Sequence, residues 1–194
     1  MRVLGIDPGS RVTGYGIVDS GAGSRCRAVV CGTVRLGDGP LAERLLTLHE
    51  ALTALLAEHR PQGVAVEGIF AKVAPRSALT LGQARGIALL CAAQAELPVF
   101  EYAPATVKRS LTNAGAASKG SVARAVSMVL GLRTAMAVDA SDALAVALCH
   151  LSRARVTTNA VDGTPSAWLR ALAGAPQVRQ SRSNALLAAA LKGR

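Results

Sequence analysis

Two carboxylates in this sequence end short apolar runs, where acids are uncommon. Asp7 closes the first run and is followed directly by the turn-forming residues Pro8-Gly9-Ser10. Glu67 closes a second run, Val64-Ala-Val-Glu67, in the same way. Aspartate is depleted in strands, and its charge resists desolvation unless a partner compensates for it. The positions therefore indicate a function, such as holding a metal or positioning a phosphate.

Asp139 and Asp142 add two acids, three residues apart at the start of a predicted helix, where they would share one face. If the strands ending at Asp7 and Glu67 are adjacent and parallel, both side chains emerge at the sheet edge where ligands bind. Four carboxylates gathered there would repel one another, and divalent cations would remove that penalty. Mg2+ prefers oxygen ligands, and a pair of such ions can clamp the attacking and leaving oxygens of a phosphoryl displacement.

Each acid also has a simpler interpretation. Asp139 can be the N-cap of its helix, and Asp142 a charge that the helix dipole favours in the first turn. Glu67 can be a surface residue at a strand end. Spacing alone does not decide between these interpretations and a shared site.

The net charge of +10 is unevenly distributed along the chain. From Ala103 to Val138 there are five basic residues and no acid, and from Leu151 onward there are seven basic residues and one acid. This balance favours nucleic acid or another polyanion as a partner, although a charged surface can also serve solubility alone. Lys119 falls in a predicted loop just before a helix, a place suited to a phosphate, and Lys108 is another candidate.

The predicted loop after Glu67 combines an aromatic residue with basic ones. Phe70 lies near Lys72 and Arg76 in the sequence. An aromatic side chain in a basic loop can stack on an unpaired base. The alternative is that Phe70 anchors the loop against the domain.

Apolar periodicity and turn residues predict a mixed α/β sheet that positions these side chains. Three short strands rich in Val and Ile form an antiparallel meander, with turns at 11–14 and 21–23. A leucine-rich helix begins at Pro40 and stops at Pro61. The predicted strands are 3–7, 15–19, 28–36, 64–67 and 99–102, and the later predicted helices are 77–95, a turn or two from 104, 121–130 and 139–153.

Length and composition predict one domain, residues 1–155, followed by a basic and poorly ordered tail, residues 156–194. No apolar run is long enough to span a membrane and no signal peptide is recognised, so we expect a cytosolic protein. The cysteines lack metal-site spacing and are expected to be small buried hydrophobes. His150, on the helix of Asp142, is expected to be a core histidine.

Several of these segments, in this order, resemble the RuvC family of bacterial Holliday-junction resolvases, which have a ribonuclease H-like fold. The similarity runs from Met1 to about Arg155. It is carried by Gly5-Ile-Asp-Pro-Gly-Ser-Arg-Val-Thr-Gly-Tyr-Gly16, Val66-Glu67, Ser77-Ala-Leu-Thr-Leu-Gly-Gln-Ala-Arg-Gly86, Leu97-Pro-Val-Phe-Glu-Tyr102 and Asp139-Ala-Ser-Asp-Ala-Leu-Ala145. The family usually has Ala in place of Ser141, a difference that leaves both neighbouring acids intact.

The resemblance implies a five-stranded mixed sheet flanked by helices on both faces. It implies a structure-selective endonuclease that nicks two strands of like polarity in a four-way DNA junction, in homologous recombination and DNA repair. The implied chemistry is phosphodiester hydrolysis with two Mg2+ ions per subunit, or Mn2+ as a substitute, with Asp7 shared between the ions. The implied metal ligands are Asp7, Glu67, Asp139 and Asp142, and the implied phosphate contacts are Lys119 and Lys108, with Phe70 at the junction centre.

The resemblance further implies a homodimer, the RuvA–RuvB branch-migration complex as a partner, and no membrane. Dimerisation is expected along the helix from Ser77 to Ala95. Small side chains on that helix would let a second helix approach closely: Ala78, Gly82, Ala84, Gly86 and Ala88. The alternative is that they pack only against their own sheet.

Two other classes of protein stay open at this point. One is a non-catalytic junction-binding protein that shares the basic surface and the dimer. The other is an actin-like or sugar-kinase ATPase, because the Gly5–Ser10 segment can also open a phosphate-binding hairpin. The short chain and the lack of a second glycine-rich loop count against the ATPase.

Overall fold

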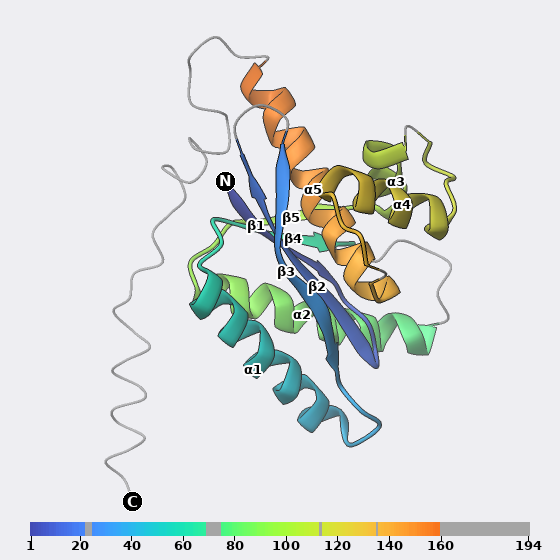
Figure 1. Ribbon diagram of the computed structural model, residues 1–194. Coiled ribbons are helices and arrows are strands. Elements are labelled where there is room, and N and C mark those ends of the chain that lie inside the picture. The colour runs from blue at the N-terminus through green and yellow to red at the C-terminus, as the bar shows by residue number, and fades with distance from the viewer. Residues whose placement is uncertain (22–24, 69–74, 113, 135, 160–194) are drawn as a thin grey trace, which may run out of the picture. The chain divides into compact units, whose positions relative to one another are not determined.

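A computed structural model describes residues 1–21, 25–68, 75–112, 114–134 and 136–159, and those up to Arg155 belong to one unit. The predicted order of strands and helices is confirmed (Figure 1). The predicted tail lies almost wholly outside the described residues. In chain order the elements are β1 (Arg2–Asp7), β2 (Val12–Ser20), β3 (Cys26–Arg35), α1 (Leu41–His59), β4 (Val64–Glu67), α2 (Pro75–Gln94), β5 (Val99–Tyr102), α3 (Pro104–Thr112), α4 (Lys119–Leu130) and α5 (Val138–Asn159).

The five strands form one mixed sheet in the order β3-β2-β1-β4-β5. β1, β2 and β3 pair antiparallel as a meander, while β4 runs parallel to β1 and β5 runs parallel to β4. The fold class expected from the sequence is therefore confirmed. Because β1 is the central strand, the residue at its carboxyl end lies in the middle of the sheet edge.

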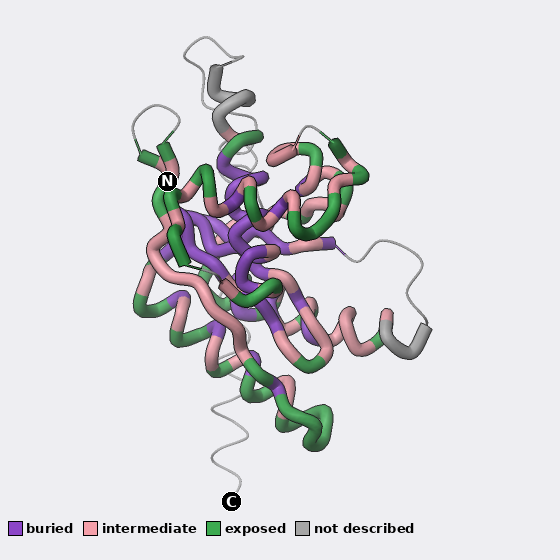
Figure 2. The backbone as a smooth tube through the Cα atoms, turned by 45° about the vertical axis from the view of Figure 1, so that its right-hand side comes forward, coloured by how far each residue is buried: buried purple, intermediate pink, exposed green. Residues whose placement is uncertain are grey.

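Helices cover both faces of the sheet, because side chains alternate between the faces along each strand. Val3 of β1 belongs to the core under α3, α4 and α5, whereas Leu4 and Ile6 belong to the core under α1 and α2. In Figure 2 the buried residues concentrate in the central strands and in α5. The odd-numbered positions of β1, which include Asp7, therefore face α5.

Three glycines let α5 lie directly on the sheet. Gly5 of β1 pairs with Gly16 of β2, and Gly14 pairs with Asp7. A Cβ atom at Gly5 would lie 2.1 Å from a backbone oxygen of α5, and one at Gly14 would lie 1.9 Å from the backbone oxygen of Asp139. We call Gly5, Gly14 and Gly16 the glycine platform. It brings the first turn of α5 to the end of β1.

Three local predictions were wrong in their boundaries. The turn expected at 11–14 ends earlier, because β2 begins at Val12 and its Gly14 pairs with β1. α4 begins at Lys119, capped by Ser118, whose side chain accepts a hydrogen bond from the Ser121 N–H, so Lys119 is helical rather than in a loop. α5 begins at Val138 and runs to Asn159, so Asp139 lies inside the first turn rather than at the N-cap.

His150 is a core residue, as expected. It is 4% exposed, and its Nδ1 lies 2.8 Å from the hydroxyl of Tyr102. Its ring lies against Phe100, with 4.1 Å between centroids. Burial lowers the pKa of His150 to about 4, so the ring is neutral at physiological pH.

The expectation for the cysteines is confirmed in part. All four are free thiols; Cys91 and Cys149 are buried, and Cys26 and Cys31 are half-buried. Across the described residues, the helices include none that combines the length and apolar character of a membrane span.

The small residues of α2 divide between two environments. Ala84 and Ala88 are 2% and 1% exposed in the core under α2, so the dimer contact expected for them is wrong. A Cβ atom at Gly82 or Gly86 would meet nothing within 4 Å. The two glycines therefore leave room beside the helix, and Ala78 is half-buried.

The glycine platform yields a test of the fold. Replacing Gly5 with Ala places a methyl group against the α5 backbone, which cannot move without displacing the helix. We expect the free energy of unfolding to fall by about 1–3 kcal/mol, measured by urea denaturation. Gly21→Ala is the control, because its Cβ would have ordinary contacts at 3.6 Å. Equal stabilities of the two variants would contradict the packing described.

Candidate active site

The ends of β1 and β4 place two carboxylates side by side. The parallel pairing of Ile6 with Val66 makes Asp7 and Glu67 the next residues of adjacent strands. Asp7 lies two residues beyond Gly5, and Glu67 two beyond Ala65, on the face that α5 covers. Both strands end there, and the predicted convergence of these two acids at one sheet edge is confirmed.

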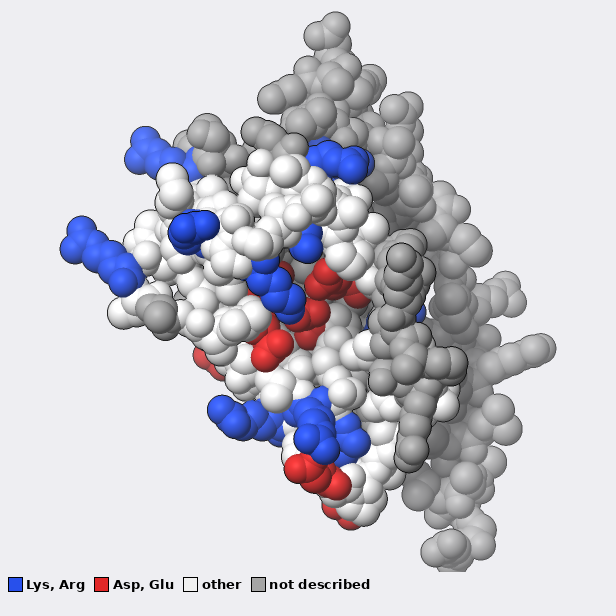
Figure 3. Space-filling view, turned by 90° about the vertical axis from the view of Figure 1, so that its right-hand side faces the viewer, with Lys and Arg blue, Asp and Glu red and all other residues white. Residues whose placement is uncertain are grey.

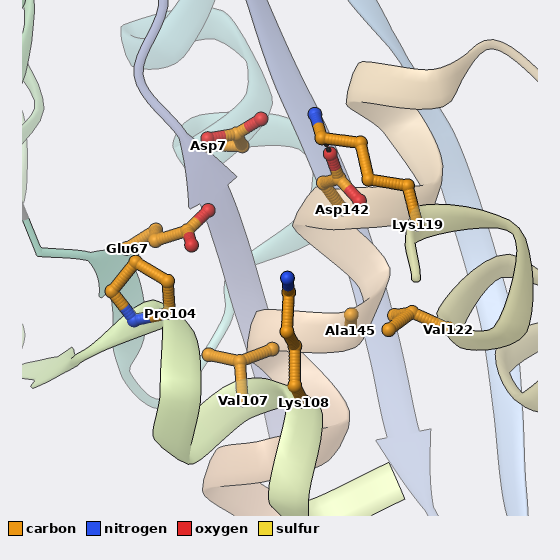
Figure 4. A pocket seen from close by; sticks show the side chains of 9 residues that line it. All are labelled: Asp7, Glu67, Pro104, Val107, Lys108, Lys119, Val122, Asp142 and Ala145. Carbon is orange, nitrogen blue, oxygen red and sulfur yellow. Dashed lines mark hydrogen bonds and ion pairs between the residues drawn. The ribbon is translucent and has the colours of Figure 1, made fainter. Parts of the chain in front are cut away.

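The third carboxylate comes from α5. Asp142 directly precedes Ala143, whose backbone oxygen rests on Gly5 of the glycine platform, and its side chain reaches the end of β1 (Figure 4). Asp7, Glu67 and Asp142 line one pocket of about 200 Å3 together with Lys108 and Lys119. Apolar residues complete its wall: Pro104, Val107, Val122 and Ala145. In Figure 3 the acids gather in a hollow with basic side chains at its rim.

Burial and the crowding of acids raise the pKa values of Asp7 and Glu67. Desolvation, followed by the charge of Glu67, raises the pKa of Asp7 to about 8, and the two carboxyl groups share a hydrogen bond. Burial likewise raises the pKa of Glu67, while the hydrogen bond from Asp7 opposes that shift. Asp7 therefore holds the shared proton. A group of half-buried acids that binds protons this readily is poised to bind a different cation.

Two lysines face the acids from the other wall of the pocket. The Nζ of Lys119 lies 3.1 Å from Oδ2 of Asp142, and this carboxylate raises the pKa of Lys119. The side chain of Lys119 is 71% exposed, whereas that of Asp142 is 17% exposed. Lys119 can therefore move away from Asp142 into solvent at little cost. Lys108 points into the same pocket from α3 (Figure 4). Both predicted lysines are thus at the site.

Asp139 is near the site but does not line the pocket. Its charge acts on Asp7 and Lys119, and its backbone oxygen lies against Gly14. Within the described residues, His, Cys, Asp and Glu side chains form no group of three that could hold a metal as they stand. The acids at this pocket, Asp7, Glu67 and Asp142, nevertheless offer only carboxylate oxygens, which are the ligands that Mg2+ prefers. The site therefore fits such an ion by its chemistry once side chains close around it.

Other predicted contacts cannot be placed. Phe70 and Lys72 lie outside the described residues, and Arg76 lies in α2 with its side chain outside them. Ser141, between the two acids of α5, is buried, and its Oγ has no hydrogen-bond partner among the described residues.

Sequence reasoning missed the glycine platform as part of the site. A usable signal was present, since glycine weakens strand interiors and marks close approach of another backbone. Gly14 and Gly16 alternate in β2, opposite Asp7 and Gly5.

Comparisons with known proteins agree with this geometry. The family model for crossover junction endodeoxyribonuclease RuvC matches residues 3–150. Curated RuvC proteins of Alkalilimnicola ehrlichii and Myxococcus xanthus are 52% and 53% identical to this chain. These matches cover 79% and 84% of this chain and 92% and 87% of the relatives.

Solved structures show the same likeness. Thermus thermophilus RuvC, in complex with a Holliday junction substrate, superposes with a TM-score of 0.77 at 36% identity, over 81% of this chain and 97% of that one. The yeast mitochondrial Holliday junction resolvase, at 15% identity and a TM-score of 0.58, covers 77% of each chain and shares the fold. Because the family model and these relatives span most of the chain, the protein belongs to the RuvC family of crossover junction endodeoxyribonucleases.

Proposed function

We propose that this protein resolves four-way DNA junctions by hydrolysing phosphodiester bonds in two strands of like polarity. The observation that carries the proposal is the pocket in which Asp7, Glu67 and Asp142 face Lys108 and Lys119. It occurs in a chain 36% identical to a RuvC solved with a Holliday junction substrate. The biological setting would be homologous recombination and DNA repair in the cytoplasm.

The proposed cofactor is Mg2+, two ions per subunit, with Mn2+ as a substitute. Asp7, Glu67, Asp139 and Asp142 would hold the ions, with Asp7 as the shared ligand because it ends the central strand. When bound, such ions supply an activated water and stabilise the leaving 3′ oxygen. The sheet and α5 place these carboxylates close together through parallel strand pairing and the glycine platform.

The lysines have a separate proposed role. Lys119 can exchange Asp142 for a phosphate oxygen, because its side chain is mostly exposed and Asp142 is its ion-pair partner among the described residues. Lys108 would approach the same phosphate from α3. A cation placed where charge develops stabilises the transition state. The apolar wall, with Val107, Val122 and Ala145, limits the water that reaches this charge.

Contacts to the junction beyond the cleaved phosphate are also proposed. Phe70 would stack on an unpaired base at the junction centre, and Lys72 and Arg76 would bind nearby phosphates. The segment 156–194, which carries five basic residues, would form a tail after the nuclease domain of residues 1–155. RuvA–RuvB would be the branch-migration partner.

A homodimer is proposed through α2. Leu79, Gly82, Gly86 and Leu90 follow one another at helical spacing on one face. Leu79 and Leu90 are 65% and 47% exposed, and the two glycines leave open space between them. A large apolar side chain beside a glycine gap suits a second helix of the same kind.

Asp7→Asn tests the catalytic assignment. Asparagine keeps the size of the side chain but cannot bind two cations, so junction binding should persist while cleavage falls by at least about 10²–10³-fold. The measurement is nicking of a synthetic four-way junction and of linear duplex in Mg2+, alongside a gel-shift assay. Glu58→Gln, at an exposed position of α1, should cleave normally. Nicking by Asp7→Asn at the wild-type rate would refute the assignment.

The shifted pKa of Asp7 yields a prediction for stability. The pKa of Asp7 is about 8 in the folded state and 3.8 for a free aspartate, so the folded state binds the proton more tightly. Stability without metal must therefore fall as pH rises between these values. In EDTA, the Tm of Asp7→Asn relative to wild type should increase from pH 5 to pH 8. Parallel Tm curves for the two proteins would contradict the crowding of the carboxylates.

Gly82→Leu tests the dimer. Leucine would fill the open space on the exposed face of α2 and should shift the protein from dimer to monomer at micromolar concentration, measured by sedimentation velocity. Gly120→Ala, in α4, is the control and should leave the association unchanged. A wild-type protein that is monomeric at these concentrations, with or without junction DNA, would contradict the proposed dimer.

A further inference from the structure

A second group of basic residues surrounds the turn between β1 and β2. Arg35, the last residue of β3, is the cross-strand partner of Val12. The carbonyl of Arg11 accepts a hydrogen bond of 2.8 Å from the N–H of the residue after Arg35. Arg44 of α1 donates through Nη2 to the carbonyl of Ser10. We call Arg11, Arg35 and Arg44 the turn arginines.

The turn arginines lie on the opposite side of Asp7 from Lys108. The turn begins directly after Asp7, and the strand order places β2 and β3 on one side of β1. β4 and β5 lie on the other side, and α3, which carries Lys108, follows β5. In Figure 3 basic side chains accordingly appear on both sides of the hollow that holds the acids.

The turn itself is held in one conformation. Thr13 is fully buried, and its Oγ1 accepts a hydrogen bond from the N–H of Gly9 at 3.3 Å and lies 3.4 Å from the Gly9 carbonyl, to which it can donate. A Cβ at Gly9 would lie 1.8 Å from the backbone oxygen of Val12, so the turn is tight. Arg44 closes it from α1. The backbone of the turn is therefore held close to Asp7.

Two of the turn arginines are accessible to a ligand. Arg35 is exposed, and the side chain of Arg11 is 76% exposed in an ion pair of 3.0 Å with Asp38. Asp38 is itself 75% exposed, and an ion pair this well hydrated is worth little, so a phosphate can displace the carboxylate. Arg44 is half-buried, and its Nε has no hydrogen-bond partner among the described residues. Its role is to position the turn.

We propose that Arg11 and Arg35 bind backbone phosphates of the DNA on the β2–β3 side of the carboxylates, and that Arg44 holds the turn for them. The inference rests on the proposed function. A strand whose cleaved phosphate lies at Asp7 continues in both directions, and Lys108 lies on the β4–β5 side alone. Arginine suits the other direction, because its planar fork binds phosphate oxygens in pairs.

The salt dependence of junction binding tests the proposal. In an Asp7→Asn background that cannot cleave, Arg35→Gln should reduce the slope of log K against log salt by about 0.9, the value for one lost phosphate contact. Arg27→Gln is a matched control, because Arg27 is an exposed arginine at the opposite end of β3, 3.6 Å from Asp19. Arg27→Gln should keep the parental slope. Equal slopes for Arg35→Gln and Arg27→Gln would overturn the proposal.

A change of opposite sign provides the second test. Asp38→Asn removes the carboxylate that competes for Arg11 and should tighten junction binding severalfold at low salt. Glu58→Gln removes an exposed acid at the far end of α1 and should leave the affinity unchanged. Tightening by both variants to the same degree would reflect net charge alone and would overturn the proposal.

The outcomes separate this inference from the proposed function. A wild-type protein that neither binds nor nicks four-way junctions would refute the proposed function. Binding and nicking by the wild type, with an unchanged salt slope in both Arg11→Gln and Arg35→Gln, would refute only the role of the turn arginines. Thermal unfolding of each variant checks that a lost slope does not come from a lost fold.

Discussion

The repulsion among carboxylates at the end of β1 is the constraint on which the rest of the structure depends. Asp7 and Glu67 are adjacent because their strands are parallel neighbours, and Asp142 joins them because α5 rests on glycines. Each carboxylate alone would prefer water, and burial, together with the charges of neighbouring acids, raises the pKa values of Asp7 and Glu67. The sheet and two hydrophobic cores supply the stability that keeps these charges in place.

Positive charges placed around Asp7 offset the repulsion among the carboxylates. The shared proton lies within the pair of acids, and Lys119 pairs with Asp142 at the pocket wall. The turn arginines and Lys108 lie on either side of the cluster. A polyanion that lies across this edge meets positive charge before and after it passes the acids, so the same arrangement that concentrates negative charge does not repel the proposed substrate.

Sequence reasoning predicted the strands, their order along the chain and the convergence of Asp7, Glu67 and Asp142, because apolar periodicity and strand ends are local signals. It failed where contacts between distant segments decide where a helix begins. Lys119 is helical because Ser118 caps α4, and Asp139 lies inside the first turn of α5 rather than at its N-cap, with its backbone oxygen against Gly14. Asp7 with its turn would also fit an ATPase; the acids supplied by distant segments are what separate the two classes of protein.

The glycine platform also limits how this enzyme can change. Every substitution of a glycine adds a Cβ, so Gly5, Gly14 and Gly16 have no conservative replacement, and at each of them the new atom would meet α5 within 3 Å. Random mutagenesis would thus find its tolerant positions at exposed sites such as Glu58 or Arg27. Substitutions that alter the cleavage preference should therefore be sought on the surface around the hollow. The glycine platform beneath it does not tolerate single substitutions.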